Sequence, residues 1–247
     1  MPSDNRVTIR VWGDYACFTR PEMKVERVSY PIITPSAARG VLEAIFWEPE
    51  MCYLIDRIAV VKKGRWFSFR RNEVSAVISI DSAKSWMRGK TPVKFIEAGG
   101  GAADAAQRNM LALADVEYLI TAEVRLTRRG QQPAANLGKY LDEVRRRAQK
   151  GKCCHRPALG CREFVADFDW VEPEALDLVP LAKWEQEDLG LMLYDVFDHE
   201  RREVVTVEEP HVRPGAMFFR ATVNNAVMDC HPDRIGDRIL RSRSNQE

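Results

Sequence analysis

The chain has 247 residues, a formal net charge of +1 and 45% hydrophobic residues. This length allows one large domain, or one domain with a small one attached. No segment approaches the ~20 consecutive apolar residues of a membrane span, and residues 1–6 lack the apolar stretch of a secretory signal. These features exclude a membrane partner and predict a cytoplasmic protein.

The small net charge conceals an uneven distribution along the chain. Residues 167–209 contain 14 acidic and 3 basic residues, a net charge of −11, so the rest of the chain carries +12. A basic body with an acidic C-terminal region can bind a polyanion on one face and repel it from another.

The first predicted elements are a strand over residues 7–12, where apolar and polar side chains alternate, and a helix after Thr34. Thr34 is a favourable N-cap, a proline follows it at the first helical position, and Pro49 ends the helix. Arg39 and Glu43 form an i,i+4 pair on the outer side. The inner side carries an apolar stripe at helical spacing, formed by Ala38, Val41, Leu42 and Ile45.

The middle of the chain predicts two strands and an irregular segment. The strands are expected over residues 52–63 and 66–80, with a turn at residues 62–65. Residues 81–114 are irregular and basic and contain a glycine run. Such a segment suits a mobile insertion that closes over a ligand, although glycine runs are also typical of plain linkers.

The next elements complete a recognisable order. Strict alternation over residues 116–126 predicts a strand, a helix follows between Asn136 and Gly151, and residues 164–170 predict one more strand. This order is typical of a split βαβ arrangement. The sequence therefore predicts an α+β fold with a ferredoxin-like (RRM-type) domain over residues 1–170.

The C-terminal part changes to acidic loops and short strands. These strands are predicted over residues 191–196, 204–207 and 217–228, the last with a hairpin turn at Asn224 and Asn225. The pattern predicts a small β-rich acidic domain over residues 171–233, followed by a disordered tail over residues 234–247.

Six cysteines in a chain without a secretory signal predict reduced thiols. Cys153, Cys154, His155 and Cys161 lie close together in the sequence, but their spacing fits no standard zinc site. A structural role is therefore favoured over metal binding. No cofactor motif stands out, so neither a metal nor a cofactor is expected.

The segment from residue 7 to residue 49, which includes residues 12–21, resembles the N-terminal signature of the Cas-five family of CRISPR effector complexes. It is most similar to the type I-C branch, within the RAMP group of CRISPR RNA (crRNA)-binding proteins. Residues 159–164 also resemble an element of that branch. The resemblance implies a ferredoxin-like domain that holds the crRNA 5′ handle in a Cascade-type complex, beside its backbone and large subunits. It also implies metal-free cutting of precursor crRNA in the repeat hairpin.

Residues 136–140 match the family's Gly-Lys-His element, in which Lys and His serve RNA cleavage. There the ribose 2′-OH attacks its own 3′-phosphate, which requires a base, a cation on the phosphorane oxygens and an acid. The resemblance implies catalytic positions at Lys139, Tyr140 and Phe46. Phe46 stands where the family uses an aromatic or His residue, and it cannot move a proton. Tyrosine, with an unperturbed pKa of ~10, is a poor base at neutral pH.

Two questions about this element stay open in the sequence. A lysine in the first turn of a helix is disfavoured by the macrodipole, so Lys139 either binds a phosphate or is a solvated side chain. The missing proton carrier has three candidates to compensate for it, which are Tyr30, Arg39 and His155.

Basic residues are the expected contacts to RNA phosphates. The run over residues 145–156 is either an exposed helix face or a phosphate track. The candidate RNA-binding residues are Arg20, Lys24, Arg39, Arg70, Arg71, Arg145, Arg146, Arg147, Lys150, Lys152 and Arg156. The histidines at 199, 211 and 231 are interpreted as surface residues.

Three functions follow from these observations. The first is an endoribonuclease that processes precursor crRNA and keeps the mature crRNA in the complex. The second is a crRNA-handle scaffold without cleavage, motivated by Phe46 and Tyr140. The third, a metabolic enzyme of ferredoxin-like fold, is disfavoured because no cofactor motif or pair of catalytic carboxylates stands out.

Overall fold

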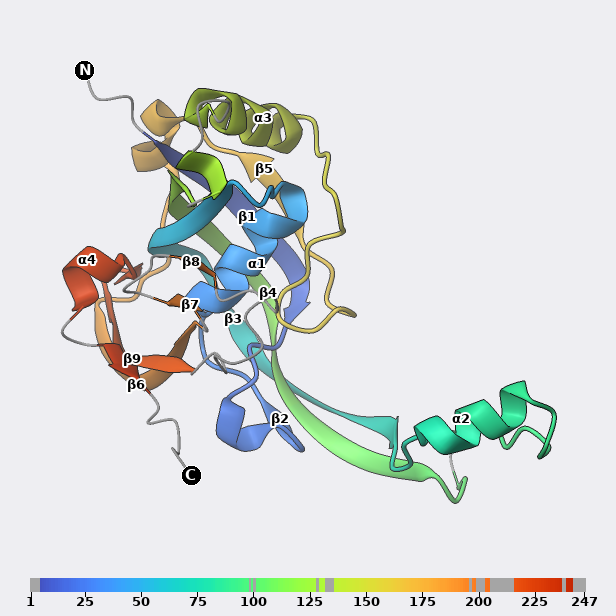
Figure 1. Cartoon of the computed structure of the whole chain (residues 1–247). Helices are drawn as coiled ribbons and strands as arrows, with labels where there is room; N and C mark the ends of the chain where they lie inside the picture. The colour runs from blue at the N-terminus through green and yellow to red at the C-terminus, as the bar shows by residue number, and fades with distance from the viewer. Residues whose placement is uncertain are drawn as a thin grey trace.

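The computed structural model describes residues 5–97, 99, 101–127, 129–131, 136–195, 197–198, 203–204, 216–236 and 239–241. Within these residues the protein is an α+β fold in which one large, mainly antiparallel sheet carries a few helices (Figure 1). No helix in the described part is long and apolar enough to cross a membrane.

Nine strands of the described chain form this sheet, in the order β11-β9-β10-β3-β4-β1-β5, with β2 attached to β4 and β6 to β9. They are β1 (Arg6–Ala16), β2 (Arg27–Val28), β3 (Met51–Val74), β4 (Ala105–Leu126), β5 (Asp167–Trp170), β6 (Gln186–Asp195), β9 (Met217–Asn224), β10 (Val227–Asp229) and β11 (Ile239–Arg241). A separate two-stranded ribbon pairs β7 (Phe197–Asp198) with β8 (Glu203–Val204).

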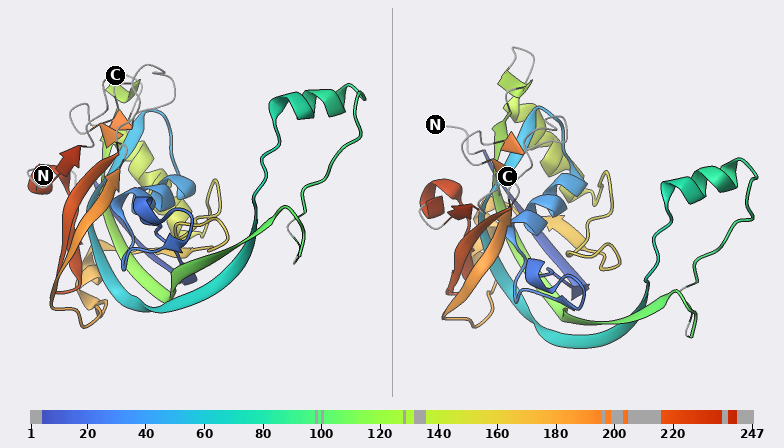
Figure 2. Two further views of the ribbon diagram at one scale, coloured as in Figure 1. Left: turned by 90° about the horizontal axis from the view of Figure 1, so that it is seen from below. Right: turned by 60° about the horizontal axis from the view of Figure 1, so that its bottom comes forward.

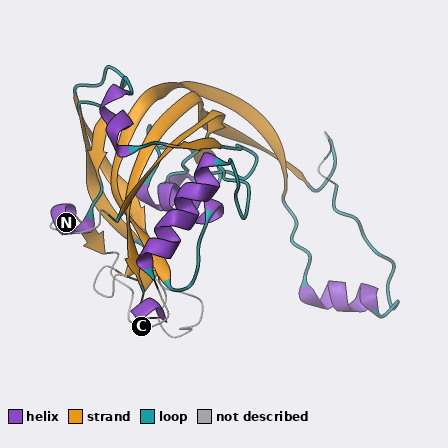
Figure 3. Cartoon of the chain, turned by 90° about the horizontal axis from the view of Figure 1, so that it is seen from above, coloured by secondary structure: helices purple, strands orange, loops and turns teal. Residues whose placement is uncertain are grey.

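The α-helices are α1 (Pro35–Ile45), α2 (Ile80–Met87), α3 (Leu137–Gln149) and α4 (Pro232–Ile235), and the 3₁₀ helices are η1 (Pro21–Met23), η2 (Arg129–Gln131) and η3 (Pro173–Leu178). Both predicted N-caps are confirmed, because Thr34 accepts a hydrogen bond from the Ala37 amide and Asn136 from the Gly138 amide. α1 packs on β3, and α3 packs on β1 and β5. Figure 3 shows both helices on the same side of the curved sheet.

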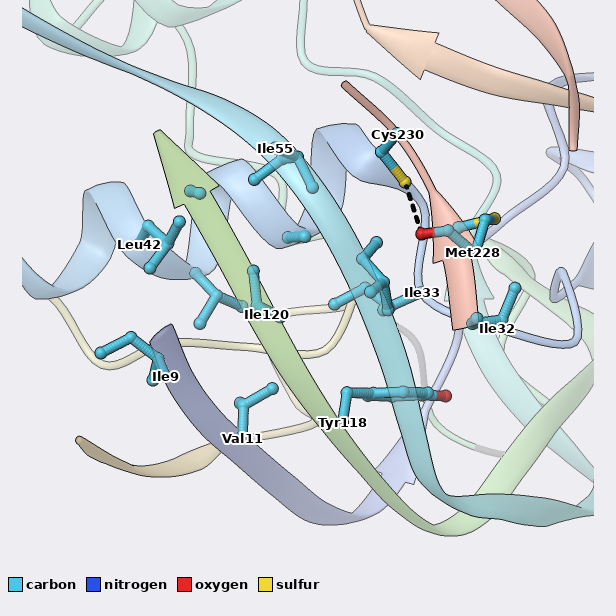
Figure 4. Close-up of a cluster of buried hydrophobic side chains, with 14 of the residues drawn as sticks. Ile9, Val11, Ile32, Ile33, Leu42, Ile55, Tyr118, Ile120, Met228 and Cys230 are labelled. Carbon is cyan, nitrogen blue, oxygen red and sulfur yellow. Dashed lines mark hydrogen bonds between the residues drawn. The ribbon is translucent and has the colours of Figure 1, made fainter. Parts of the chain in front are cut away.

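The core lies between α1 and the sheet (Figure 4). The predicted stripe of α1 is confirmed, because Ala38, Val41, Leu42 and Ile45 are all buried. These side chains belong to one cluster with strand residues such as Ile9, Ile55, Tyr118 and Ile120. Burying one large aliphatic side chain contributes about 1.5–3 kcal/mol, so the burial of Val41, Leu42 and Ile45 holds α1 against the sheet.

The strand pair β3 and β4 departs from the sequence prediction. The predicted turn at residues 62–65 is wrong, because β3 runs through it as one strand of 24 residues. A register shift between Val60 and Lys62 and a positive φ of 77° at Gly64 absorb the irregularity. β4 also starts at Ala105, eleven residues before the predicted strand, since it pairs with the whole outer half of β3.

The outer halves of β3 and β4 leave the body of the protein and carry α2 at their far end (Figure 2). We call residues 65–114 the arm. It occupies most of the segment that the sequence predicts as irregular, and of residues 70–109 none that is described is buried. The prediction that this insertion is mobile remains a prediction.

The C-terminal strands extend the same sheet, because β10 pairs with β3. The hairpin between β9 and β10 turns at Asn225 and Ala226, both with positive φ, one residue later than predicted. The predicted disorder is wrong for residues 239–241, because they form β11, which pairs with β9. Residues 242–247, His199, His211 and residues 205–207 lie outside the described residues.

Two smaller predictions also change. The strand expected over residues 164–170 is shorter and begins at Asp167. His231 is buried and not a surface residue, because its Nδ1 accepts a hydrogen bond from the Asp233 amide at the start of α4. Its Nε2 lies 2.9 Å from a carboxylate oxygen of Glu123.

Candidate functional site

The end of α1, the start of β3 and the first turns of α3 enclose a cavity of about 440 Å³, which we call the Lys139 cavity. Its lining residues are Phe46, Glu48, Glu50, Lys139, Tyr140, Glu143 and Arg147. The three residues that the sequence places at the catalytic positions are therefore brought together. A second cavity of about 430 Å³ continues over the first turns of α3, past Asn136, Gly138 and Arg146.

Phe46 forms the aromatic wall of the Lys139 cavity. It follows the last residue of α1, and its carbonyl accepts a hydrogen bond of 2.8 Å from the Tyr53 hydroxyl. Its ring centroid lies 6.4 Å from that of Tyr140, and the Arg147 guanidinium lies 5.1 Å from the Phe46 ring centroid. Phe46 is only 6% exposed and belongs to the core, so it shapes the cavity and supports Arg147.

Lys139 is exposed in the first turn of α3, and it forms no ion pair with any described residue. The amides at the start of a helix and a nearby ammonium both attract a phosphate. This geometry favours the phosphate-binding interpretation of Lys139 over that of a solvated side chain.

Two residues of the cavity, Tyr140 and Glu143, have shifted pKa values. Burial, followed by the carboxylates of Glu50 and Glu48, raises the pKa of Tyr140 above its ordinary value. Tyr140 is thus a neutral phenol that donates a hydrogen bond, and it is a still poorer base than a free tyrosine. Hydrogen bonds from Arg146 and then Arg147 lower the pKa of Glu143 to about 2, so this carboxylate stays ionised.

The candidate RNA-binding residues of α3 and the loop after it do not share one side of the helix, because Arg145 lies over the ring of Trp170 and Arg147 over that of Phe46. Arg145 is paired with Glu172 at 2.7 Å, and Arg156 is paired with Asp167. Lys150 and Lys152 are exposed, and neither is paired with another described residue. Lys150 and Lys152 follow the C-terminal end of α3, whereas Lys139 lies in the first turn of this helix.

A second group of candidates lies at the base of the arm. Arg70 is exposed and donates a hydrogen bond to Gln107, whereas Arg71 is paired with Glu73 and Glu163. Arg20 stacks over the ring of Tyr30 at 4.5 Å, and Lys24 is exposed after η1.

Arg39 differs from the other candidates, because its side chain is only 12% exposed. It donates hydrogen bonds to both carboxylate oxygens of Asp195, at 2.6 and 3.0 Å, and it also pairs with Glu43. Burial opposes the charge of Arg39, but the bonds to Asp195 outweigh burial and raise its pKa. The prediction that Arg39 binds RNA is corrected: it joins α1 to β6.

None of the three candidates to replace the missing proton carrier lines the Lys139 cavity. Tyr30 is 1% exposed, and Arg39 is held by Asp195. His155 lines a different cavity of about 820 Å³, on the outer side of α1, together with Arg156 and Arg162. The sequence reasoning also missed Glu48 and Glu50, since they flank Pro49 and carry no motif. Only the fold brings them to α3.

The cysteines do not converge with other ligand types. Among the described residues, no group of three or more His, Cys, Asp or Glu side chains is placed to hold a metal ion. Cys154 accepts a hydrogen bond from Arg147, and Cys161 lies beside Cys17 in a small buried cluster.

Comparisons with known proteins give relatives over most of the chain and solved structures of the same fold. The chain is 41% identical over 233 residues to the CRISPR pre-crRNA endoribonuclease Cas5d of Mannheimia succiniciproducens, a match covering 92% of this chain and 96% of that one. It is 45% identical over 216 residues to the protein of the same name from Thermus thermophilus, covering 87% of this chain and 80% of the relative.

Two solved structures share the fold. One is a crystal structure of a CRISPR-associated protein, with a TM-score of 0.60 and 19% identity over 91% of this chain and 90% of that one. The other is the functionally uncharacterized protein SMU1763c from Streptococcus mutans, with a TM-score of 0.61 and 20% identity over 93% of both chains. The family described as CRISPR-associated protein (Cas_Cas5) matches residues 7–231, and the chain therefore belongs to this family.

Proposed function

We propose that this protein cuts precursor crRNA in the repeat hairpin and keeps the 5′ handle of the product. The observation that carries the proposal is its identity of 41% and 45% to two proteins named CRISPR pre-crRNA endoribonuclease, over most of each chain. The Lys139 cavity supports it, because it places a free lysine, a phenol and an aromatic wall at one helix start.

The chemistry is an in-line attack of the ribose 2′-OH on its own 3′-phosphate. Lys139 stabilises the charge on the phosphorane oxygens, as a preorganised cation does in such reactions. Tyr140 donates its hydroxyl proton toward the reacting phosphate, and Phe46 shapes the cavity. The products are a 2′,3′-cyclic phosphate and a 5′-hydroxyl, formed without a divalent metal ion.

RNA contacts follow from the charge distribution. The exposed cations after α3 and at the arm base give two positive surfaces, and their phosphate contacts would make affinity fall as salt rises. The acidic segment at residues 167–209 directs RNA away from the C-terminal strands. The remaining partners are the backbone and large subunits of a type I-C Cascade complex.

The architecture proposed for this function is a ferredoxin-like domain with an acidic β-rich appendage. The strand order β5-β1-β4-β3, all antiparallel, supports the first part, since it follows from two βαβ units built around α1 and α3. The strands after residue 171, which join the sheet through β10, form the appendage.

The test is a cleavage assay with purified protein and a labelled repeat hairpin in EDTA, with both product ends mapped. We expect slow cutting at one position and a cyclic phosphate end. Phe46 favours a second function, a scaffold that binds the handle without cutting it. Tight binding with no product in EDTA would establish that second function.

A further inference from the structure

The proposed reaction needs a group that removes the 2′-hydroxyl proton, and the residues matched to the family do not supply it. Phe46 has no titratable group. Tyr140 keeps its proton, because burial and two neighbouring carboxylates raise its pKa. Lys139 is placed as the cation. The base must therefore come from the other residues that line the Lys139 cavity.

Glu50 is the carboxylate best placed for this task. It lies immediately before β3, and its carbonyl accepts a hydrogen bond of 2.9 Å from the Thr127 amide. A side chain at Gly130 would collide with this same carbonyl, so the glycine lets η2 pack against it. The main chain of Glu50 is thus fixed, while its half-buried carboxylate has no cation partner in the described part of the chain.

The two other carboxylates of the cavity are less suited. Glu143 is held by Arg146 and Arg147 at 2.6 Å each, which makes it a carboxylate that resists protonation. Glu48 is exposed in the turn after α1 and acts on Tyr140 more weakly than Glu50 does.

We infer, on the basis of the proposed cleavage, that Glu50 is the general base that accepts the 2′-hydroxyl proton and that Tyr140 is the acid that protonates the leaving oxygen. A carboxylate and a phenol in one cavity have proton affinities that differ widely. This difference is what separates a base from an acid in paired catalytic groups.

The proton balance closes between these two residues. The Glu50 carboxylate takes the 2′-hydroxyl proton as O2′ bonds to phosphorus. The P–O5′ bond breaks, its electron pair stays on O5′, and the Tyr140 hydroxyl gives that oxygen its proton. The phenolate then recovers a proton from the Glu50 carboxylic acid, directly or through one water molecule. Both groups return to their starting state, and no water is consumed.

The test compares the wild-type protein with Glu50→Gln, with Glu48→Gln as the competing carboxylate of the same cavity, and with Glu174→Gln as the matched control, an exposed glutamate of η3 that does not line the cavity. Single-turnover cleavage of the labelled hairpin is measured in EDTA. Binding is measured separately with a hairpin that carries 2′-deoxyribose at the cut site and cannot react. The charged and titratable groups that face Glu50 in the cavity, and that stay constant in this comparison, are Lys139, Tyr140, Glu143 and Arg147.

We expect Glu50→Gln to lower the cleavage rate by roughly 10²–10⁴-fold, the usual contribution of a general base, and to bind the deoxy hairpin at least as tightly. Glu174→Gln should keep the wild-type rate, and Glu48→Gln should lose much less of it than Glu50→Gln does.

Other outcomes separate the two proposals. If wild type and Glu50→Gln cut at similar rates, Glu50 is not the base, while cleavage itself stands. If Glu48→Gln loses the rate and Glu50→Gln keeps it, the assignment to Glu50 is overturned in favour of Glu48. If wild type makes no product, both the cleavage activity and its base are rejected.

Discussion

The Lys139 cavity and the arm are built in opposite ways. The cavity lies between the segment after α1 and the first turns of α3, and its lining residues come from parts of the chain that are about a hundred residues apart in sequence. The arm is held mainly by the pairing of β3 with β4 and by a few ion pairs to the body, such as that of Arg71 with Glu163, and none of its described residues between 70 and 109 is buried. The cavity is thus backed by the core of the body, whereas the arm has the few buried contacts typical of segments of low local stability.

The largest effect that separates the two regions is expected at Lys139. Lys139→Ala should lower the cleavage rate by about 10²–10³-fold, the scale for removing one charge-stabilising group. The matched control is Lys84→Ala, which removes an equally exposed lysine from α2 at the end of the arm. Single-turnover assays in EDTA compare the two. A similar loss from both changes would mean that the active site is misplaced.

A smaller effect, on RNA affinity, is expected from the exposed cations after α3 and at the base of the arm. The double change of Lys150 and Lys152 to Ala should weaken binding to all RNA sequences alike and reduce the salt slope of log affinity by about 2, or about 1 per phosphate contact. Arg70→Ala, at the arm base, should reduce it by about 1. Titrations of repeat and random RNA at several salt concentrations measure both. An unchanged slope would show that these side chains touch no phosphate.

The arm itself provides a third, qualitative test. Residues 81–101 should be cut readily by protease in the free protein, because no described residue among them is buried, and should be protected once crRNA or neighbouring subunits bind. Mapped fragments from limited proteolysis, before and after assembly, report this. Equal protection in both states would show that the arm is as rigid as the body of the protein, so that the arm and the Lys139 cavity would not differ in local stability.

The sequence predicted the two regions unequally, for physical reasons. The caps at Thr34 and Asn136 and the stripe from Ala38 to Ile45 depend on local spacing, so they were predictable. The length of β3 was not, because Lys62 to Arg65 resembles a turn and only pairing with β4 keeps it extended. The ion pair of Arg39 and the cavity position of Glu50 could not be predicted for a related reason. The residues near them in the fold lie about 90 to 155 residues away in sequence, beyond the reach of any periodic pattern.

The smallest expected effect tests whether the aromatic wall of the cavity acts only by its shape. Phe46→Tyr restores a residue type that the resemblance implies at this position and adds a hydroxyl beside Tyr140. A buried hydroxyl without a partner costs about 1–3 kcal/mol, but the Lys139 cavity offers the Glu50 carboxylate as an acceptor. We therefore expect an intact fold and a rise in cleavage of a few-fold, since a second phenol supports the transfer to O5′.

Tyr140→Phe removes the hydroxyl of the proposed acid. It tests whether the higher cleavage rate expected of Phe46→Tyr comes from proton transfer by a second phenol. If Tyr140 is the acid, Tyr140→Phe should lose most of the rate, and Phe46→Tyr in that background should restore part of it, because the ring centroids of the two positions lie only 6.4 Å apart. Melting curves check that each variant folds, and single-turnover rates give the comparison. If Phe46→Tyr leaves the rate unchanged in both backgrounds, the residue at position 46 only shapes the cavity and transfers no proton. The proton transfers are then confined to α3 and Glu50.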